Sequence, residues 1–225
     1  MIPRVTFLLH CRGVPIHSAS FRSPFRSSRP RQTFLRPQSA STRPASAACP
    51  DDVLKFWFED LSPTDWFASN AALDDRIRDK FQDTLNRAAR CELDGWRADA
   101  DGSLAEIIVL DQFSRNVHRN APLAFAQDGL ALALAQEAIS KGFDRQLPTA
   151  KKTFLYMPFM HSESRVIHAR AVSLFGETGQ TQLEFETQHK AIVDRFGRYP
   201  HRNKILGRES TPEEESFLKE PGSSF

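Results

Sequence analysis

Apolar side chains recur every three or four positions along most of the chain after residue 50, which is the spacing of one face of an α-helix. Between Ala71 and Cys91 this apolar face consists of Leu73, Ile77, Phe81, Leu85 and Ala88. Comparable patterns predict helices over residues 103–118, 125–141 and 180–196. No stretch alternates apolar and polar residues as a half-buried strand does. The pattern therefore predicts an all-α domain in which short loops join antiparallel helix pairs.

Capping residues indicate where several helices begin. Acidic residues at Asp51 and Asp52 precede an apolar run and predict the N-terminus of a short first helix. Either Ser162 or Ser164 is predicted to cap a helix that runs to about Phe175. The Thr-Pro-Glu-Glu sequence at residues 211–214 combines a Thr cap, a proline at the first helical position and a glutamate two residues later. It predicts a last short helix.

Glycine and proline indicate where helices end. We expect Gly142 to end the helix over residues 125–141 and Gly197 to end the helix over residues 180–196. Pro158 interrupts an apolar run and is predicted to end or kink a helix there. Cys91 falls at the end of a helical pattern and is expected to be a buried, inert thiol.

Residues 1–50 differ in composition from the rest of the chain. They contain eight Arg, no Lys and no acidic residue, and they show no sustained helical or strand periodicity. Such a segment cannot build a core. Its Arg and Ser richness predicts an organellar transit peptide, most simply mitochondrial, with a chloroplast as the alternative. A disordered tail, or upstream sequence wrongly included in the gene, is the other interpretation, and it would leave the protein in the cytoplasm. We therefore expect one folded domain over residues 51–225.

The charge of that domain restricts its partners. The formal charge is +2 for the whole chain, yet residues 51–225 carry 22 basic and 28 acidic residues. A domain with a net negative charge argues against nucleic-acid binding. The chain also lacks a run of about twenty apolar residues, so no membrane insertion is predicted.

The motifs of several common enzyme classes are absent from the sequence. It contains no phosphate-binding glycine loop, no G-x-S-x-G, no C-x-x-C and no H-E-x-x-H. Glu186 and His189 have the spacing of a helix-bundle metal ligand pair, but it occurs once where such sites need two. His189 lies on an apolar stripe and is expected to be a hydrogen-bonded core histidine. No metal site and no cofactor are predicted.

One polar motif occurs twice. Residues 111–120 and 194–203 both read D-x-F-x-R-x-x-H-R-N, so six positions are identical and five of those are polar. Packing alone seldom requires the same polar set twice. In the first copy, a helix would place Asp111 and Arg115 on one face, and in the second copy Pro200 would leave the final residues on a loop.

The repeated motif has two interpretations. In the functional one, Arg115, Arg198, His201 and Arg202 surround one cavity, where guanidinium groups bind a carboxylate or phosphate through paired hydrogen bonds. In the structural one, the Asp and Arg residues stabilise helix ends, while histidine and Asn203 cap backbone carbonyls.

A second candidate segment is His161-Ser162-Glu163, which follows the proline break. A histidine and a carboxylate could project into the same cavity as an acid–base pair. Capping by Ser162, with Glu163 in the first helical turn, explains the same residues without any chemistry.

Several segments in order resemble the bacterial family known as domain of unknown function 924. The matching segments are Phe56-Trp57-Phe58, Trp66-Phe67, Leu93-Asp94-Gly95-Trp96, residues 110–116, Phe125-Ala126, residues 154–163, residues 195–203, Leu206-Gly207-Arg208 and residues 210–214. The resemblance implies a tetratricopeptide-like helical fold and brings no catalytic residues with it. Ser114 stands where the family pattern usually has Pro, Tyr199 where it usually has Phe, and His118 where an aromatic residue is more frequent.

Three functions are compatible with these residues. The first is a module that binds a small anionic molecule or an anionic peptide end in a cavity lined by the motif residues Asp111, Arg115, His161, Glu163, Arg198, His201, Arg202 and Asn203. The second is a hydrolase or transferase that uses His161, Glu163 and His201 in the same cavity, with Asp111 beside them. The third is a purely structural organellar protein. The sequence leaves the ligand and the oligomeric state open.

Overall fold

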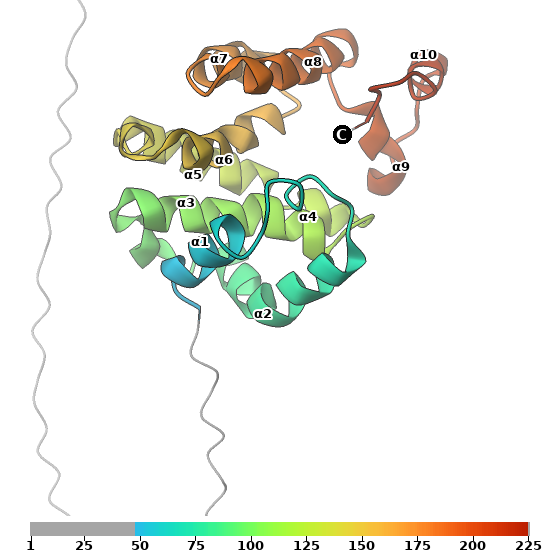
Figure 1. The fold of residues 1–225 in the computed structure, drawn as a ribbon. Helices are drawn as coiled ribbons and strands as arrows, with labels where there is room; N and C mark the ends of the chain where they lie inside the picture. Colours follow the sequence, from blue (N-terminus) through green and yellow to red (C-terminus); the bar gives the residue numbers. More distant parts are fainter. Residues whose placement is uncertain (1–47, 225) are drawn as a thin grey trace, which may run out of the picture. The chain divides into compact units, whose positions relative to one another are not determined.

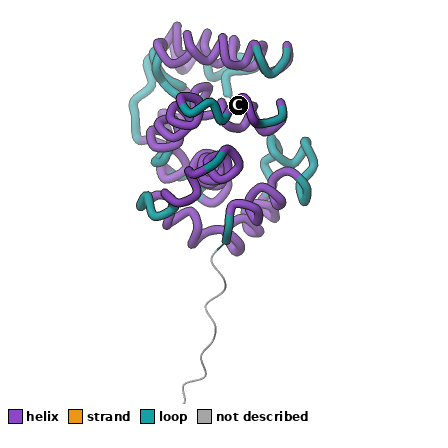
Figure 2. Tube along the Cα trace, turned by 90° about the vertical axis from the view of Figure 1, so that its left-hand side faces the viewer, coloured by secondary structure: helices purple, strands orange, loops and turns teal. Residues whose placement is uncertain are grey.

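The computed structural model describes residues 48–224, so most of the predicted transit segment and Phe225 lie outside the described residues. Within residues 48–224 every regular element is helical, which confirms the all-α prediction (Figure 2). The α-helices are α1 (Pro50–Phe58), α2 (Ala71–Ala89), α3 (Ala100–Ile108), α4 (Ser114–Val117), α5 (Asp128–Ser140), α6 (Thr149–Met160), α7 (Arg165–Gly176), α8 (Gln180–Phe196), α9 (Asn203–Leu206) and α10 (Pro212–Phe217). Between them lie the 3₁₀ helices η1 (Asp94–Ala98), η3 (Pro122–Phe125), η4 (Asp144–Gln146) and η5 (Pro200–Arg202), and the π-helical turn η2 (Val109–Phe113).

The helices stack in successive layers. Figure 1 shows α7 and α8 together in one layer, α5 and α6 in the next, and α3 with α4 below them. Consecutive helices pack directly on each other, α5 on α6, α6 on α7 and α7 on α8. Helix α3 contacts α1, α5 and α6, so the segment over 103–118 lies at the centre of the domain.

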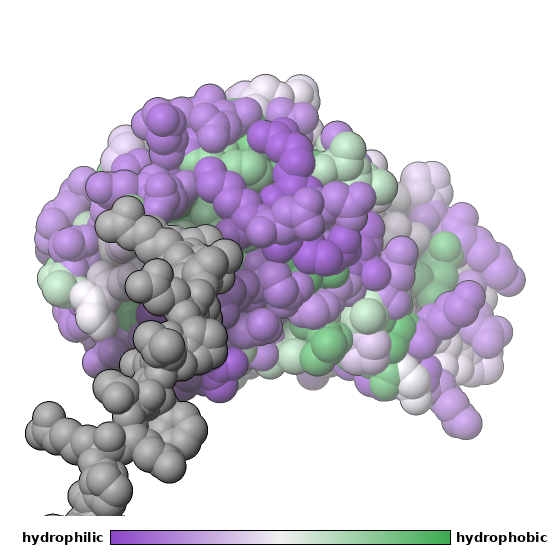
Figure 3. Space-filling model, turned by 90° about the horizontal axis from the view of Figure 1, so that it is seen from below, coloured by the Kyte–Doolittle hydropathy of each residue, from purple (hydrophilic) through white to green (hydrophobic). Residues whose placement is uncertain are grey.

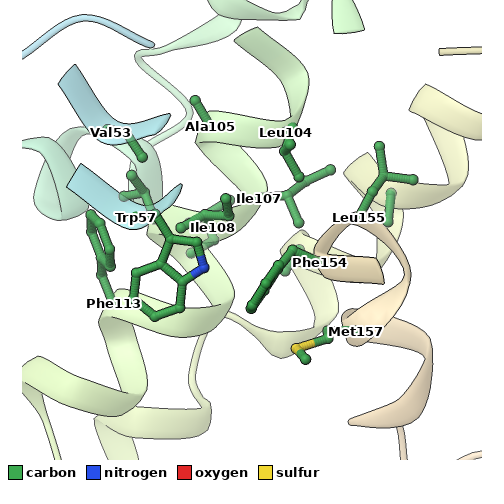
Figure 4. Packing of buried hydrophobic residues seen from close by; sticks show 14 of the residues in the cluster. Val53, Trp57, Leu104, Ala105, Ile107, Ile108, Phe113, Phe154, Leu155 and Met157 are labelled. Carbon is green, nitrogen blue, oxygen red and sulfur yellow. The ribbon is translucent and has the colours of Figure 1, made fainter. Parts of the chain in front are cut away.

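Aromatic rings fill the core between α1, α3 and α6. Trp57 of α1 meets Phe113 at 5.6 Å and Phe154 at 5.5 Å between ring centroids, both in edge-to-face geometry (Figure 4). Phe113 also lies 4.8 Å from the ring of Phe81, which brings α2 into the same cluster. Such contacts add stability beyond the apolar area that they bury. The cluster therefore fixes η2, to which Phe113 belongs, against three helices.

Several predicted helix ends are confirmed. The side chain of Ser164 caps α7, and the helix over 180–196 forms with the predicted bounds. Thr211 and Glu214 form the predicted capping box at the start of α10. Gly197 takes a left-handed φ of 71° after α8, a conformation that a residue without a Cβ adopts at little cost.

Three predictions about helix ends were wrong in detail. Of the two outcomes predicted at Pro158, an end or a kink, the end is wrong: α6 continues to Met160, because a proline near a helix C-terminus removes only one hydrogen bond before the helix stops. Cys91 is exposed rather than buried, since α2 ends at Ala89 and Cys91 takes a φ of 58° in the following turn. Glu163 precedes α7 instead of lying in its first turn.

The single helix predicted over residues 103–118 is interrupted by the π-helical turn η2, which separates α3 from α4. All five residues of this turn are buried. A π-helical turn breaks the i to i+4 hydrogen-bond register of an α-helix, and such turns occur frequently at functional sites. This one contains Asp111.

No helix among residues 48–224 is long and apolar enough to cross a membrane. Figure 3 shows one face of the domain that is mainly hydrophilic, with hydrophobic residues in small separate areas.

Candidate functional site

A cavity of about 330 Å³ opens between the start of α5, the segment after α6 and the region of η5 and α9. Its polar wall consists of Asp128, His161, Ser162, Glu163 and Arg202, and Phe125, Leu132 and Leu206 are among its apolar residues. The polar residues come from segments far apart in the sequence. The fold thus brings residues 161–163 together with Arg202 of the second motif copy, both of which the sequence indicated.

Asp111 is the buried centre of the polar network behind this wall. Its side chain is only 1% exposed, and it accepts hydrogen bonds from Gln112 at 2.6 Å and Arg115 at 3.0 Å. Arg115 also donates to the backbone oxygen of Asp111 at 2.7 Å, so one guanidinium holds both the carboxylate and the backbone of the π-helical turn. Burial favours a raised pKa for Asp111, but the charge of Arg115 and the hydrogen bonds from His161 and Gln112 outweigh it and hold the pKa well below its usual range.

His161 completes this network from the other side. It is the C-cap of α6, and its Nδ1 lies 2.7 Å from Oδ1 of Asp111. Because Asp111 is ionised, the proton of the neutral His161 ring is on Nδ1, and this N–H donates a hydrogen bond to the carboxylate. The lone pair of the ring is then on Nε2. Burial, followed by the charge of Arg115, lowers the pKa of His161, so its imidazole is neutral at pH 7.

Asp128 links two arginines at the cavity wall. Arg115 donates to its two carboxylate oxygens at 2.9 and 3.0 Å, and Arg202 donates to Oδ2 at 3.3 Å. Asp128 lies in the first turn of α5, where an acid is also favoured by the helix dipole. For that reason the sequence alone offered no sign that Asp128 belongs to the site.

Arg202 is buried but poorly paired. Its side chain is 7% exposed, and its Cζ lies over the rings of Phe125 at 4.7 Å and Tyr199 at 4.5 Å. Among the described residues its guanidinium makes a single hydrogen bond, to Asp128, and its buried Nε has no partner. Burial, followed by the charge of Arg115, lowers the pKa of Arg202.

A second buried network anchors the backbone on both sides of His161. His168 of α7 places Nδ1 2.7 Å from Glu186 Oε1 and Nε2 2.8 Å from the backbone oxygen of Ser162. The hydroxyl of Tyr199 donates to the backbone oxygen of Met160 at 2.5 Å. The residues immediately before and after His161 are therefore fixed from α7 and from the segment after α8.

Sequence reasoning missed this second network. Glu186 was considered only as a partner of His189, and His168 was not singled out at all. His189 is buried, as expected of a core histidine, and its Nδ1 lies 2.7 Å from the backbone oxygen of Phe185. The sequence did offer one signal for this network. His168 and Glu186 lie on two consecutive predicted helices, and consecutive helices often pack side by side, as α7 and α8 do.

Glu163 lines the cavity but is not the partner of His161. Its carboxylate accepts hydrogen bonds from Arg208 at 2.6 and 2.9 Å and from the backbone N–H of Tyr199 at 2.8 Å. Burial alone favours a raised pKa for Glu163, yet the hydrogen bonds from Arg208 and Tyr199 lower it. In the sequence, Arg208 stood out only as part of a segment that matches the family. In the structure it holds the carboxylate of Glu163 in the cavity wall.

The remaining predicted residues lie outside the cavity wall. Arg198 donates to the carboxylate of Glu214 at 2.6 and 2.8 Å, and Asn203 donates to the same carboxylate at 3.2 Å. These contacts fasten α10 to the loop after α8. The ring centroid of His201 lies 5.5 Å from that of Tyr199, and burial, then Arg202, lowers its pKa to about 4. Of the eight predicted residues, Asp111, Arg115, His161, Glu163 and Arg202 are thus brought together.

The two copies of the repeated motif do not form equivalent sites. Asp111 is buried in the π-helical turn, whereas the side chain of Asp194 is 45% exposed and pairs with Lys190. Arg115 binds Asp111 directly, and Arg198 binds Glu214 instead of Asp194. Each copy contributes different residues to the neighbourhood of a single cavity.

Comparison with known proteins identifies the relatives of this domain. The model of a family described as "Bacterial protein of unknown function (DUF924)" matches residues 53–222. The chain belongs to this family. A solved structure, described as a protein of unknown function, ATU0120, from Agrobacterium tumefaciens, is 42% identical to this chain. Its TM-score is 0.73, and the match covers 76% of this chain and 96% of that one. No curated protein matches the chain. The family resemblance seen in the sequence is confirmed, and the tetratricopeptide-like relationship stays a prediction.

Proposed function

We propose that this DUF924 domain binds a carboxylate, on a small acid or at the C-terminus of a peptide, in the cavity beside Arg202. The observation that supports this most directly is the guanidinium of Arg202, which is buried at the cavity wall and makes one hydrogen bond among the described residues. A guanidinium has five N–H donors, and a buried donor without an acceptor costs free energy. A ligand carboxylate supplies the missing acceptors and the missing negative charge.

The contrast with neighbouring arginines supports the same assignment. Arg115 makes four hydrogen bonds to Asp111 and Asp128, and Arg208 donates twice to Glu163. These two guanidinium groups are satisfied within the protein. Only Asp128 reaches Arg202 among the described carboxylates, and Asp128 is shared with Arg115.

The size and lining of the cavity favour a small ligand. A volume of about 330 Å³ is at the lower end of the range for ligand sites. Phe125, Leu132 and Leu206 provide apolar contacts, while Arg202 provides the oriented polar group. The aromatic rings over Arg202 also reduce its contact with water, which strengthens a charge-assisted hydrogen bond to a ligand.

Thermal unfolding with defined carboxylates tests this proposal. Succinate, an N-acetylated tripeptide acid and the corresponding tripeptide amide are compared at matched ionic strength. A carboxylate at ten times its Kd stabilises by about 1.4 kcal/mol, which corresponds to a Tm rise of roughly 3–5 °C for a domain of this size. The amide should have no effect. A preference for succinate over the peptide acid would identify a small acid as the ligand.

Arg202→Gln should abolish the stabilisation, because glutamine keeps one hydrogen-bond donor but removes the charge and the paired geometry. Arg195→Gln is the matched control, since Arg195 is half-exposed and pairs with Glu213 outside the cavity. The proposal fails if neither carboxylate raises Tm at about 50 mM, or if both variants respond as the wild type does. In that case the alternative of a structural domain is favoured.

A further inference from the structure

The cavity also contains an oriented base. We propose that His161 acts as the general base in the hydrolysis of an ester that also carries a free carboxylate. Asp111 is its positioning residue. This inference rests on the proposed carboxylate binding, because Arg202 would hold the ligand beside His161. Neither Glu163 nor His201, the partners considered from the sequence, takes part in the pair.

The geometry of Asp111 and His161 is that of a carboxylate–imidazole pair. The 2.7 Å contact from Nδ1 to Oδ1 fixes the ring orientation and leaves Nε2 as the proton acceptor. Asp111 itself cannot rotate freely, since Gln112 holds Oδ2 and Arg115 holds Oδ1. A carboxylate held in this way keeps the imidazole in one tautomer and stabilises the imidazolium that forms when the base accepts a proton.

The second ring nitrogen of His161 is available to a substrate. Its side chain is 16% exposed, it lines the cavity, and Nε2 makes no hydrogen bond within residues 48–224. The backbone on each side is anchored by Tyr199 and His168, so the ring is carried on a fixed turn. Two independent features, the buried acceptor behind the ring and the open nitrogen in front of it, thus point to proton transfer.

The step balances with water as the second reactant. His161 Nε2 accepts a proton from a water molecule while the water oxygen bonds to the ester carbonyl carbon. The carbon–oxygen bond to the leaving alcohol then breaks, and the leaving oxygen takes the proton from Nε2. The products are a carboxylic acid and an alcohol, and His161 is neutral again. An ester suits this site better than an amide, because an alkoxide is a better leaving group than the nitrogen of an amide, which must be protonated before its bond to carbon breaks.

A carboxylated activated ester provides the test. The hydrolysis of mono(4-nitrophenyl) succinate is compared with that of 4-nitrophenyl acetate, which lacks the free carboxylate. The wild-type protein should hydrolyse the succinate ester with saturation, and succinate should inhibit it competitively. His161→Asn should lower kcat/KM by about 100-fold or more, as expected for the loss of a general base. His118→Asn is the matched control, because His118 caps the end of α4 and does not line the cavity.

Asparagine at position 161 retains an N–H that can donate to Asp111, so this variant keeps the buried carboxylate paired. Asp111→Asn tests the positioning role through the pH profile. In the wild type, the charge of Asp111 raises the pKa of His161 against the larger effect of burial. Its loss should move the acidic limb of the profile to lower pH and reduce the plateau rate by about 10-fold or more. A merely structural role of Asp111 would leave the limb where it is.

Equal hydrolysis by the wild type and His161→Asn would overturn the catalytic inference. If succinate still stabilises both proteins, carboxylate binding survives and only the catalytic role fails. If succinate stabilises neither the wild type nor His161→Asn, the proposed binding function fails as well. Arg202→Gln should raise KM for the succinate ester and so reduce the preference for this ester over the acetate ester, whereas Arg195→Gln, outside the cavity, should leave both rates unchanged.

Discussion

The carboxylate of Glu163 is bound by the guanidinium of Arg208, 45 positions later in the chain, through hydrogen bonds of 2.6 and 2.9 Å. This pair joins the turn after α6 to the loop after α9, and its Glu163 lines the cavity. A carboxylate held in this way is a structural support. It is therefore unsuited to the acid–base role that its position beside His161 suggested.

Replacing this carboxylate should weaken the fold without removing the proposed base. Glu163→Gln replaces a charge-assisted pair by one neutral hydrogen bond, and each partner is about a quarter exposed. The free energy of unfolding should fall by about 1–2 kcal/mol, measured by urea titration. Glu209→Gln serves as a control, because Glu209 makes no side-chain ion pair with any residue between 48 and 224. A loss in Glu163→Gln no larger than in that control would contradict a supporting role.

Stability should decrease as the solution becomes acidic, for two reasons that act in the same direction. The pKa of Glu214 is lowered to about 2, chiefly by Arg198 against the effect of burial, so its contribution is complete above about pH 4.5 and is lost as pH falls towards 2. The pKa of His201 is lowered to about 4 by burial and Arg202, so the unfolded chain binds a proton that the folded domain does not. Stability therefore falls from about pH 6.5 towards pH 4.

His201→Asn should reduce the slope of unfolding free energy against pH between about 6.5 and 4, since it removes one group that protonates on unfolding. The measurement is a series of urea titrations across this interval. His118→Asn is a weaker comparison, because the pKa of His118 is also lowered, by burial and Arg78. An unchanged slope in His201→Asn would show that folding does not lower the pKa of His201.

The buried pair of His168 and Glu186 should show strong coupling. Their side chains are fully buried and 2.7 Å apart, and burial raises the pKa of Glu186 against the opposing effect of His168. His168→Leu leaves Glu186 without this partner and should cost about 3–5 kcal/mol. The double variant with Glu186→Leu should recover a large part of that loss. Additive losses in the double-mutant cycle would show that the two residues do not stabilise each other.

The segment over residues 1–50 can be tested separately from the domain. Its eight arginines and its lack of acids predict import into mitochondria when it is fused to a fluorescent protein in a eukaryotic cell. A matched fusion with four of these arginines changed to glutamine should remain in the cytoplasm. Chloroplast import in plant cells would support the alternative organelle, and a cytoplasmic wild-type fusion would contradict the transit prediction.

The helices were predictable because their causes are local. Apolar spacing, the Thr211 capping box and the glycine after α8 each act within a few residues, and the corresponding helix ends formed as predicted. The π-helical turn was not predictable from spacing, because Asp111 and its neighbours also fit an ordinary α-helix. Its geometry is set by packing of Phe113 and by Arg115.

The site was only partly predictable because its pairings are long-range. Asp111, Arg115 and Arg202 were named from the repeated motif, and His161 from the segment after the proline. The carboxylate that contacts His161 is that of Asp111, 50 positions earlier in the chain, and this contact depends on how the helices stack. In a sequence, Glu163 is the nearer partner, and only the fold reveals that Arg208 binds it.

The π-helical turn makes the length of this segment decisive for the directions of two side chains. Removing one residue from Val109–Phe113 would restore an unbroken α-helical hydrogen-bond pattern, and the remaining helix would form readily. The residues on one side of the deletion would then be rotated by about 100° relative to those on the other. Either Asp111 or the aromatic core contact of Phe113 would lose its present direction. The additional residue of the π-helical turn therefore lets Asp111 face the polar network while Phe113 packs in the aromatic core.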